Sequence, residues 1–377
     1  MRQWLAAIGL GLLLLLSACD ARRVSAEERI FLPLSLDYVG ECELNDLEFE
    51  DTPIGGLSGL SYDRDRDRFY VLSDDKSRLA PARFYTVAMQ LDPDAGINRI
   101  AIENVTFLQT PKEENFPGGS LDPEGIALLP ANEIYVSSEG NFNAAIEPFI
   151  ARFNLETGTW QDALPLPPYY IWDEEGQGIQ NNAGFEALTL NPGARNSQGE
   201  PYRVFVATES PLQQDLELEE GISTIRNRLL HYAIVDGTPQ FIAEHLYPLD
   251  VANPSVVANG LTEMVALDEA GHFLSLERTY SPFSGTAVKI FQFAIADATD
   301  ILGRSRLGEA ADVRSIRKQL LWSSRDAGVT VDNLEGMTLG PRLSDGSQSL
   351  VLVSDDNFNQ FASPQVTQFL LFRLERE

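Results

Sequence analysis

The stretch that decides the fold is Asp332-Asn333-Leu334-Glu335-Gly336-Met337-Thr338-Leu339, followed after a turn by Leu350-Val351-Leu352-Val353-Ser354-Asp355-Asp356-Asn357. Apolar residues alternate or run together in both segments, a pattern that predicts the two strands of a β-hairpin. Glu335 stands near the start of the first strand, and Asp355 and Asp356 end the second. Because those two ends lie side by side in an antiparallel pair, the acids are expected to gather at one edge of the sheet.

The same hairpin recurs four more times along the chain. The other copies open with residues 56–62, 122–128, 184–190 and 260–267, and return through residues 68–75, 133–139, 204–209 and 272–278. Two further strand candidates follow each of the first four hairpins, and one follows the fifth. When the copies are aligned on Ser58, Glu124, Glu186, Glu263 and Glu335, successive positions are 66, 62, 77 and 72 residues apart.

Such near-regular repetition of a four-stranded unit predicts an all-β fold, a single β-propeller with five blades. The last unit lacks a fourth strand, and residues 30–39 are available to supply it and so to close the ring. The longer intervals also allow a sixth blade. The alternative architecture is a pair of β-sandwich domains.

The N-terminus predicts export and lipidation. A short basic start, Met1 to Trp4, precedes an apolar run from Leu5 to Leu16 and the sequence Leu16-Ser17-Ala18-Cys19. This order is typical of a bacterial lipoprotein signal peptide over residues 1–18, with Cys19 lipidated. An uncleaved anchor is the alternative, although the run is shorter than the roughly 20 residues of a spanning helix.

The sequence therefore predicts how the chain is divided into segments and where the protein is located. We expect a lipidated tether over residues 19–29 and a propeller domain over residues 30–377. The protein should lie in an extracytoplasmic compartment of the bacterial cell envelope. Its contact with the membrane would be through the N-terminal lipid only.

The charge of the chain limits its partners. The 377 residues include 28 Lys and Arg against 56 Asp and Glu, which gives a formal net charge of −28. A broad basic face for nucleic acid is therefore excluded, and we expect a soluble monomer that can bind cations. Excess acid also keeps a surface solvated, so only its placement can identify functional carboxylates.

In a propeller the innermost strand of each blade lines the central channel, so the repeated acids are expected to form a ring at its mouth. The ring would contain Glu124, Glu186, Glu263 and Glu335, with Ser58 at the fifth place, and Asp74, Asp75, Glu139, Glu209, Glu277, Asp355 and Asp356 just outside it. Converging carboxylates repel one another unless they are protonated or bound to a cation. Their oxygen atoms suit Ca²⁺, with Glu124, Glu186, Glu263, Glu335, Asp355 and Asp74 as the expected ligands. The alternative is a structural role, in which these acids accept backbone N–H bonds.

Three other residues are candidates for contact with a substrate. Arg278 interrupts the acidic pattern, and it either pairs with a ring carboxylate or holds an anionic group of the substrate. Tyr170 and Trp172, in the connection before the third unit, are expected on the channel face. Aromatic residues in such a connection can equally pack against a neighbouring blade.

Taken together, these residues resemble the phytase-like family of bacterial propellers, described as "esterase-like activity of phytase". The similarity lies in Gly56-Leu57-Ser58-Gly59-Leu60, Asp122-Pro123-Glu124-Gly125-Ile126, Gly184-Phe185-Glu186-Ala187-Leu188 and Asn333-Leu334-Glu335-Gly336-Met337. The resemblance implies a propeller and the hydrolysis of phosphate or carboxyl esters.

We therefore expect a metal-dependent hydrolase with catalytic candidates Glu335, Glu263, Glu124 and Glu186. A bound Ca²⁺ would polarise the ester, and a neighbouring carboxylate would act as the base. The alternative is a propeller without catalytic activity that binds a ligand or a protein partner at the same face.

Overall fold

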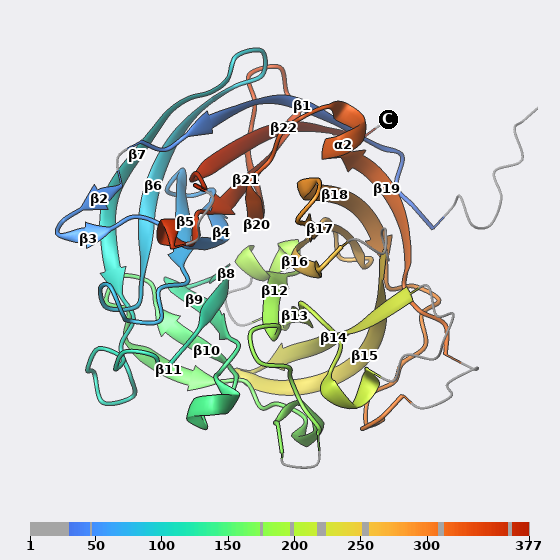
Figure 1. Cartoon of the computed structure of the whole chain (residues 1–377). Helices are drawn as coiled ribbons and strands as arrows, with labels where there is room; N and C mark the ends of the chain where they lie inside the picture. The colour runs from blue at the N-terminus through green and yellow to red at the C-terminus, as the bar shows by residue number, and fades with distance from the viewer. Residues whose placement is uncertain are drawn as a thin grey trace, which may run out of the picture. The chain divides into compact units, whose positions relative to one another are not determined.

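Short antiparallel strands account for most of the fold, as the alternation of apolar residues predicts. A computed structural model describes residues 30–45, 47–173, 176–196, 200–216, 224–250, 256–307, 313–360 and 364–376, and residues 33–377 form one unit. Within these described residues, five four-stranded sheets are arranged as the blades of a β-propeller (Figure 1). The predicted all-β propeller with five blades is confirmed.

The first four blades each follow the chain from the innermost strand to the outermost. Blade one contains β4 (Leu57–Asp63), β5 (Arg68–Ser73), β6 (Arg83–Asp92) and β7 (Gly96–Phe107). Blade two contains β8 (Pro123–Leu129), β9 (Glu133–Ser138), β10 (Phe149–Asn154) and β11 (Trp160–Ala163). Blade three contains β12 (Phe185–Leu190), β13 (Tyr202–Thr208), β14 (Thr224–Val235) and β15 (Thr238–Asp250). Blade four contains β16 (Ala258–Ala266), β17 (His272–Ser281), β18 (Gly285–Ala294) and β19 (Arg317–Ser323).

Blade five joins the two ends of the propeller. It contains β20 (Asn333–Arg342), β21 (Gln348–Asp355), β22 (Gln368–Arg376) and, outermost, β1 (Leu34–Glu43). β1 runs antiparallel to β22, with Leu36 opposite Leu374, and the two strands lie side by side in Figure 1. The prediction that an N-terminal strand closes the ring is confirmed, although this strand begins at Leu34 rather than at residue 30.

The remaining elements are short. β2 (Glu48–Phe49) and β3 (Thr52–Pro53) form a small hairpin, and α2 (Ser324–Ala327) is one helical turn. The 3₁₀ helices cover Phe142–Ala144, Pro168–Tyr170, Pro192–Asn196, Gln213–Asp215 and Asn357–Asn359. None of the helices in the described part of the chain has the length and apolar character needed to cross a bilayer.

Five apolar clusters hold the blades together, one between each pair of neighbouring blades. Successive side chains of a strand point to opposite faces, so each blade packs against a neighbour on both sides. At the closure, Val351 and Leu371 of blade five pack with Leu60 and Val71 of blade one. A blade therefore buries its faces only when its neighbours are present.

The innermost strands β4, β8, β12, β16 and β20 surround the centre of the propeller (Figure 1). A cavity of about 530 Å³ is lined by their later residues, which include Leu60, Ile126, Leu188, Met264 and Met337. The acidic residues at the starts of these strands do not line this cavity. The carboxylates and the cavity therefore occupy opposite ends of the channel.

Candidate active site

Each innermost strand carries a β-bulge at the same place. The pairing with the second strand shifts between Leu57 and Gly59, Pro123 and Ile126, Phe185 and Leu188, Leu261 and Glu263, and Leu334 and Gly336. A bulge inserts one extra residue and redirects a side chain. The residues that directly follow the last paired position are Ser58, Glu124, Glu186, Thr262 and Glu335. Three of the five blades thus place a glutamate there.

The second strand of each blade brings another charged residue to the same level. The residues paired with the position before the bulge are Ser73, Ser138, Thr208, Glu277 and Ser354, and the next residues are Asp74, Glu139, Glu209, Arg278 and Asp355. At this position blades one, two, three and five therefore have an acidic residue, and blade four has a basic residue, Arg278. Asp122, just before β8, completes the group. We call Asp74, Asp122, Glu124, Glu139, Glu186, Glu209, Glu335 and Asp355 the mouth cluster.

The prediction that Glu263 belongs to this group is wrong. Thr262 occupies the bulge of blade four, and Glu263 pairs with Leu276 one residue further on. Its Oε1 atom accepts hydrogen bonds from the backbone N–H groups of Leu188, at 3.1 Å, and Met264, at 2.9 Å. Glu263 therefore has the structural role that was the alternative for the ring, because it links blades three and four.

Glu277 is displaced from the group by the same one-residue offset. It accepts hydrogen bonds from the Tyr247 hydroxyl at 2.6 Å and from the Asp250 N–H at 3.1 Å, and it pairs with Lys318. Burial is the largest cause of its raised pKa, and Lys318 opposes that shift. Glu277 thus belongs to a separate buried network that joins blade four to Tyr247 and Asp250 of blade three.

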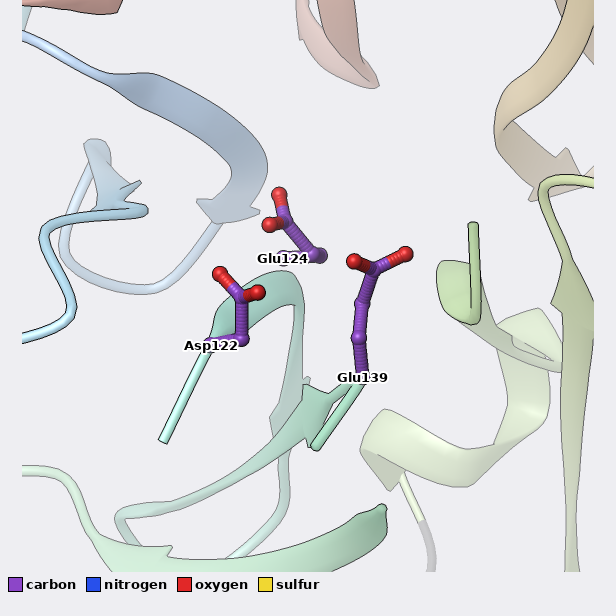
Figure 2. Close-up of side chains that lie close together, drawn as sticks. All are labelled: Asp122, Glu124 and Glu139. Carbon is purple, nitrogen blue, oxygen red and sulfur yellow. The ribbon is translucent and has the colours of Figure 1, made fainter. Parts of the chain in front are cut away.

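Asp122, Glu124 and Glu139 converge from three points of blade two (Figure 2). One carboxylate oxygen from each lies within 4.8 Å of the other two. The Asp122 N–H donates to Ser138 Oγ at 2.9 Å, and the Glu139 N–H donates to the Asp122 carbonyl at 3.0 Å, which fixes the two backbones together. Asp122 is 3% exposed, and its Oδ1 atom has no hydrogen-bond partner among the described residues.

A second group lies directly beside the first. Glu139, Glu186 and Glu209 also bring carboxylate oxygens within 4.8 Å of one another, so Glu139 belongs to both groups. The Gly184 N–H donates to Glu139 Oε1, and the Glu209 N–H donates to the Gly184 carbonyl at 2.7 Å. The first of these hydrogen bonds ties the start of blade three to the Glu139 side chain of blade two, and the second joins two strand ends within blade three.

Two basic side chains neutralise part of the mouth cluster. Lys76 pairs with Asp122 Oδ2 and donates to Asn182 Oδ1 at 3.2 Å. Arg278 pairs with Glu335 and, at 2.9 Å, with Glu209. The pairing that was one of the two expectations for Arg278 is confirmed. All three ion pairs are largely buried, so their charges are poorly screened by solvent.

Burial is the largest cause of the raised pKa values in the mouth cluster, and repulsion between neighbouring acids adds to it. It raises the pKa of Asp74, Glu124, Glu139, Glu186 and Asp355 well above the usual range. The pKa values of Asp122 and Glu335 are also raised by burial, with Lys76 and Arg278 respectively opposing the shift. Deprotonation of these carboxyl groups is costly unless additional positive charge is present.

Two acids next to the mouth cluster have structural roles instead. Asp75 accepts hydrogen bonds from the N–H groups of residues 78–80 and pairs with the buried Arg83. Asp356 accepts from the Gly56 N–H at 2.9 Å and the Phe358 N–H at 3.0 Å. Asp75 directly follows Asp74, and Asp356 directly follows Asp355. Each therefore holds in place the loop next to a residue of the mouth cluster.

Comparison with known families agrees with this geometry. The model of the Phytase-like family, described as "Esterase-like activity of phytase", matches residues 52–358. The match covers most of the chain and includes all eight carboxylates of the mouth cluster. The chain belongs to the Phytase-like family.

Solved structures similar to this Phytase-like protein include a member of the duf4221 family from Bacteroides vulgatus, at 9% identity, with a TM-score of 0.35 and coverage of 92% of this chain and 99% of the other. Another is a putative oxidoreductase (glucose dehydrogenase) from Thermus thermophilus, at 10% identity, with a TM-score of 0.38 and coverage of 91% and 100%. A third is the catalytic domain of an α-L-arabinofuranosidase from Coprinopsis cinerea, at 10% identity, with a TM-score of 0.40 and coverage of 91% and 97%. No curated protein matches the sequence.

Of the two expected aromatic contacts of this Phytase-like protein, Tyr170 lies in the core. Tyr170 is fully buried, stacks on Phe185 and donates its hydroxyl to Glu244 Oε1 at 2.7 Å, so it is a core residue and cannot contact a substrate here. Trp172 is half-buried, with its ring edge-on to Phe142. Cys19, the predicted lipidation site, lies outside the described residues, as does the whole signal sequence.

Sequence reasoning missed Asp122 and Lys76. Asp122 opens the second repeat, but the equivalent positions of the other repeats, Gly56, Gly184, Gly260 and Asn333, carry no acid. Lys76 follows Asp74 and Asp75 and reaches across to blade two. A local signal existed in both cases, because each lies within two residues of an acid that belongs to the mouth cluster.

Proposed function

We propose that this Phytase-like propeller is a metal-dependent hydrolase of phosphate or carboxyl esters, with its reaction centre at the mouth cluster. The observation that carries the proposal is the unpartnered Oδ1 atom of the buried Asp122, beside the converging Glu124 and Glu139. Buried carboxylate oxygens without partners are rare in folded proteins. A cation is the simplest partner for this one.

The donor set fits a hard divalent cation, and Ca²⁺ in particular. All three side chains offer oxygen, which is the ligand type that Ca²⁺ prefers. Asp122, Glu124 and Glu139 would hold the ion. When bound, it would act as a Lewis acid on the ester oxygen and lower the pKa of a bound water molecule.

Glu186 is the proposed general base. It is half-buried beside Glu139, and its carboxylate accepts no hydrogen bond from any described residue. Burial and, after it, the charge of Glu209 raise the pKa of Glu186 well above its usual range, and a carboxylate with a raised pKa is a stronger base. Glu186 would take the proton from the attacking water as the new bond to phosphorus or carbonyl carbon forms. The leaving alcohol would then receive that proton as the ester bond breaks.

Arg278 and Lys76 are proposed to position the substrate. Both lie at the rim of the mouth cluster, and the planar guanidinium can hold a phosphate or carboxylate by two hydrogen bonds. Glu335 and Asn333 would keep Arg278 in place, since Arg278 donates to the Asn333 Oδ1 atom as well as to Glu335. Two basic side chains suit a substrate with one anionic group better than a polyphosphorylated one.

An activity assay tests this proposal. The full-length chain in detergent should be assayed on phytate, aryl phosphates and short-chain aryl esters, with Ca²⁺ and with EGTA. We expect turnover only with Ca²⁺, and a loss of about 100-fold or more in kcat for Glu186→Gln. Glu263→Gln is the matched control, because its carboxylate is buried but lies outside the mouth cluster.

Two results would contradict the proposal. One is the absence of Ca²⁺-dependent turnover on all three substrate classes, which would favour the non-catalytic binding propeller. The other is full activity in Glu186→Gln, which would remove the base from the mechanism.

A further inference from the structure

The exposed apolar side chains of this protein gather at one end of the channel. Among the described residues, ten large apolar side chains are exposed. Eight of them lie on the mouth face, the face to which the mouth cluster opens: Leu47, Leu79, Phe142, Leu216, Val257, Tyr280, Phe283 and Val366. The other two, Ile242 and Leu320, lie within the outermost strands β15 and β19. None lies on a described connection at the opposite end.

Every blade contributes to this distribution. The connection between the second and third strands of each blade begins at the mouth and exposes one large apolar residue: Leu79, Phe142, Leu216, Phe283 and Val366 in blades one to five. Single exposed apolar residues are ordinary on a protein surface. Their restriction to one end of a five-bladed structure is not, and it indicates that this end meets an apolar environment.

The hairpin of β17 and β18 projects furthest from the mouth cluster along the chain of its blade. Both strands continue past Arg278, and β17 stays paired with β18 for three more residues. Phe283, in the turn, is 90% exposed. Tyr280 is 46% exposed and Val257 is 68% exposed, and the two lie side by side because the Val257 N–H donates to the Tyr280 carbonyl at 2.9 Å. Blade four therefore carries three exposed apolar side chains beyond the level of the acids.

We propose that the mouth face docks on a zwitterionic lipid surface, with Phe283 entering between the headgroups. This contact would add to that of the predicted N-terminal lipid. It goes beyond the proposed hydrolysis and does not depend on it. An apolar side chain on a projecting turn can be buried at the boundary between headgroups and acyl chains without a matching pocket.

A lipid surface fits these side chains better than a protein partner does. A stable protein interface buries a continuous patch of about 800 Å² on each partner, with its apolar residues packed at the centre. On the mouth face the centre is the acidic mouth cluster, and the apolar residues stand around it on separate connections. A fluid lipid surface accepts separate side chains wherever they project.

Charge selects a zwitterionic surface. The formal net charge of −28 and the acids of the mouth cluster repel anionic headgroups. The outermost group of a zwitterionic headgroup is an ammonium, which complements the acidic mouth, and its phosphate lies deeper. Arg325 is exposed and donates to Ser284 Oγ at 2.8 Å, beside the turn that carries Phe283. Its guanidinium is therefore placed to pair with such a phosphate.

The predicted tether permits this orientation. β1 begins at the end of blade five away from the mouth, because Leu34 is opposite Arg376, and Cys19 lies 15 residues before Leu34. A chain of that length spans at most about 50 Å, whereas the 10 residues of β1 span about 33 Å. A lipid on Cys19 can therefore reach the plane of the mouth face.

Fluorescence quenching measures whether the turn enters the lipid. The full-length chain with Phe283→Trp is reconstituted into phosphatidylcholine vesicles with brominated acyl chains, and the emission of the unmodified protein is subtracted. We expect bromine to remove about half or more of the added emission, because side chains at this boundary lie about 5–10 Å deep. Leu320→Trp is the matched control, since Leu320 is exposed on β19 away from the mouth face. Its added emission should not be quenched.

A second measurement tests the choice of lipid. Replacing part of the phosphatidylcholine with phosphatidylglycerol should reduce the quenching of Phe283→Trp by about twofold or more. Equal or stronger quenching on the anionic vesicles would overturn the zwitterionic surface. Equal quenching of Phe283→Trp and Leu320→Trp would overturn the docking itself.

The remaining outcomes separate this inference from its alternatives. A dimer in detergent that Phe283→Ser dissociates, seen by analytical ultracentrifugation, would assign the surface to a second copy of the chain and overturn the lipid contact. Quenching and turnover are measured independently. Quenching of Phe283→Trp without Ca²⁺-dependent turnover would therefore support the docking and count against the hydrolase only.

Discussion

Arg278 replaces, in blade four, the acid that the other four blades have at the same register. Its guanidinium links Glu209 of blade three to Glu335 of blade five, and these acids raise its pKa further above the usual arginine value despite the opposing effect of burial. A single positive charge at this point therefore connects three blades at the mouth of the channel.

Arg278→Met should destabilise the protein when metal is absent. The change leaves Glu209 and Glu335 without their basic partner in a buried setting, and removing one member of a buried pair costs about 3–5 kcal/mol. We expect the free energy of unfolding in EGTA to fall by about 3 kcal/mol, measured by urea denaturation, and added Ca²⁺ to restore part of it.

Arg325→Met is the control for this change. Arg325 is exposed, and among the described residues its side chain donates to Ser284 Oγ alone, so its replacement should change stability by less than about 0.5 kcal/mol. Equal stability of Arg278→Met and the unmodified protein in EGTA would show that the two ion pairs contribute nothing.

At the scale of the strand, the bulge explains how the acids reach the mouth. Directly after the acid or serine at the bulge, blades one, two and five have Gly59, Gly125 and Gly336. The inner strand of the next blade passes close to each of these glycines: a Cβ atom on Gly59 would lie 2.7 Å from the Glu124 carbonyl oxygen. Adjacent inner strands are thus held at a distance that only glycine permits.

Gly125→Ala should disturb both packing and the site. An added Cβ would lie 2.5 Å from the Glu186 carbonyl oxygen and 2.8 Å from Leu188 Cβ, and neither backbone nor β-carbon can rotate away. We expect a loss of about 1–3 kcal/mol, seen as a lower Tm, and weaker Ca²⁺ binding because Glu124 and Glu186 both shift.

Gly40→Ala is the matched control, since its Cβ would meet only Gly96 Cα, at 3.6 Å, an ordinary contact. Its Tm should stay close to that of the unmodified protein. A Gly125→Ala variant that melts at the same temperature as Gly40→Ala would contradict the close approach of the two inner strands.

At the scale of the whole propeller, every blade depends on its neighbours, and the mouth cluster draws residues from four of the five. Blade five is completed by β1, so the two chain ends of the propeller meet in one sheet. Repulsion among the carboxylates therefore acts between blades and opposes closure of the ring. Cations at the mouth would relieve it.

The stability of the metal-free protein should fall as pH rises. The folded state raises the pKa of Asp74, Glu124, Glu139, Glu186 and Asp355, with burial as the largest cause, whereas unfolded carboxyl groups titrate near about 4. Above that pH the folded state binds more protons than the unfolded state, so stability is lost as pH rises toward the raised values. We expect a lower Tm at pH 8 than at pH 5 in EGTA.

Ca²⁺ should reverse this trend, because it binds the deprotonated carboxylates and therefore binds more tightly at pH 8. The measurement is a pair of thermal melts at each pH, with EGTA and with Ca²⁺. A Tm in EGTA that is constant or higher at pH 8 would show that the cluster does not retain its protons in the folded state.

Much of this architecture could be predicted from the sequence by itself. Strands follow from the alternation of apolar residues, which decides the face of a strand that is buried. The number of blades follows from the five copies of the hairpin. The closing strand could be predicted because the last repeat lacks a fourth strand, which the N-terminal segment can supply. Glu124, Glu186 and Glu335 could be placed at the mouth because each begins its repeat in the same way.

The tertiary structure decided what depends on register and packing. In blade four the bulge falls on Thr262 rather than Glu263, and a shift of one residue turns a side chain to the other face of a strand. The same offset places Arg278, not Glu277, beside Glu335. Lys76 meets Asp122 only because blades one and two are neighbours. Tyr170 can be buried because its hydroxyl donates a hydrogen bond to Glu244. This partner is 74 residues away in the sequence, so no local pattern indicates it.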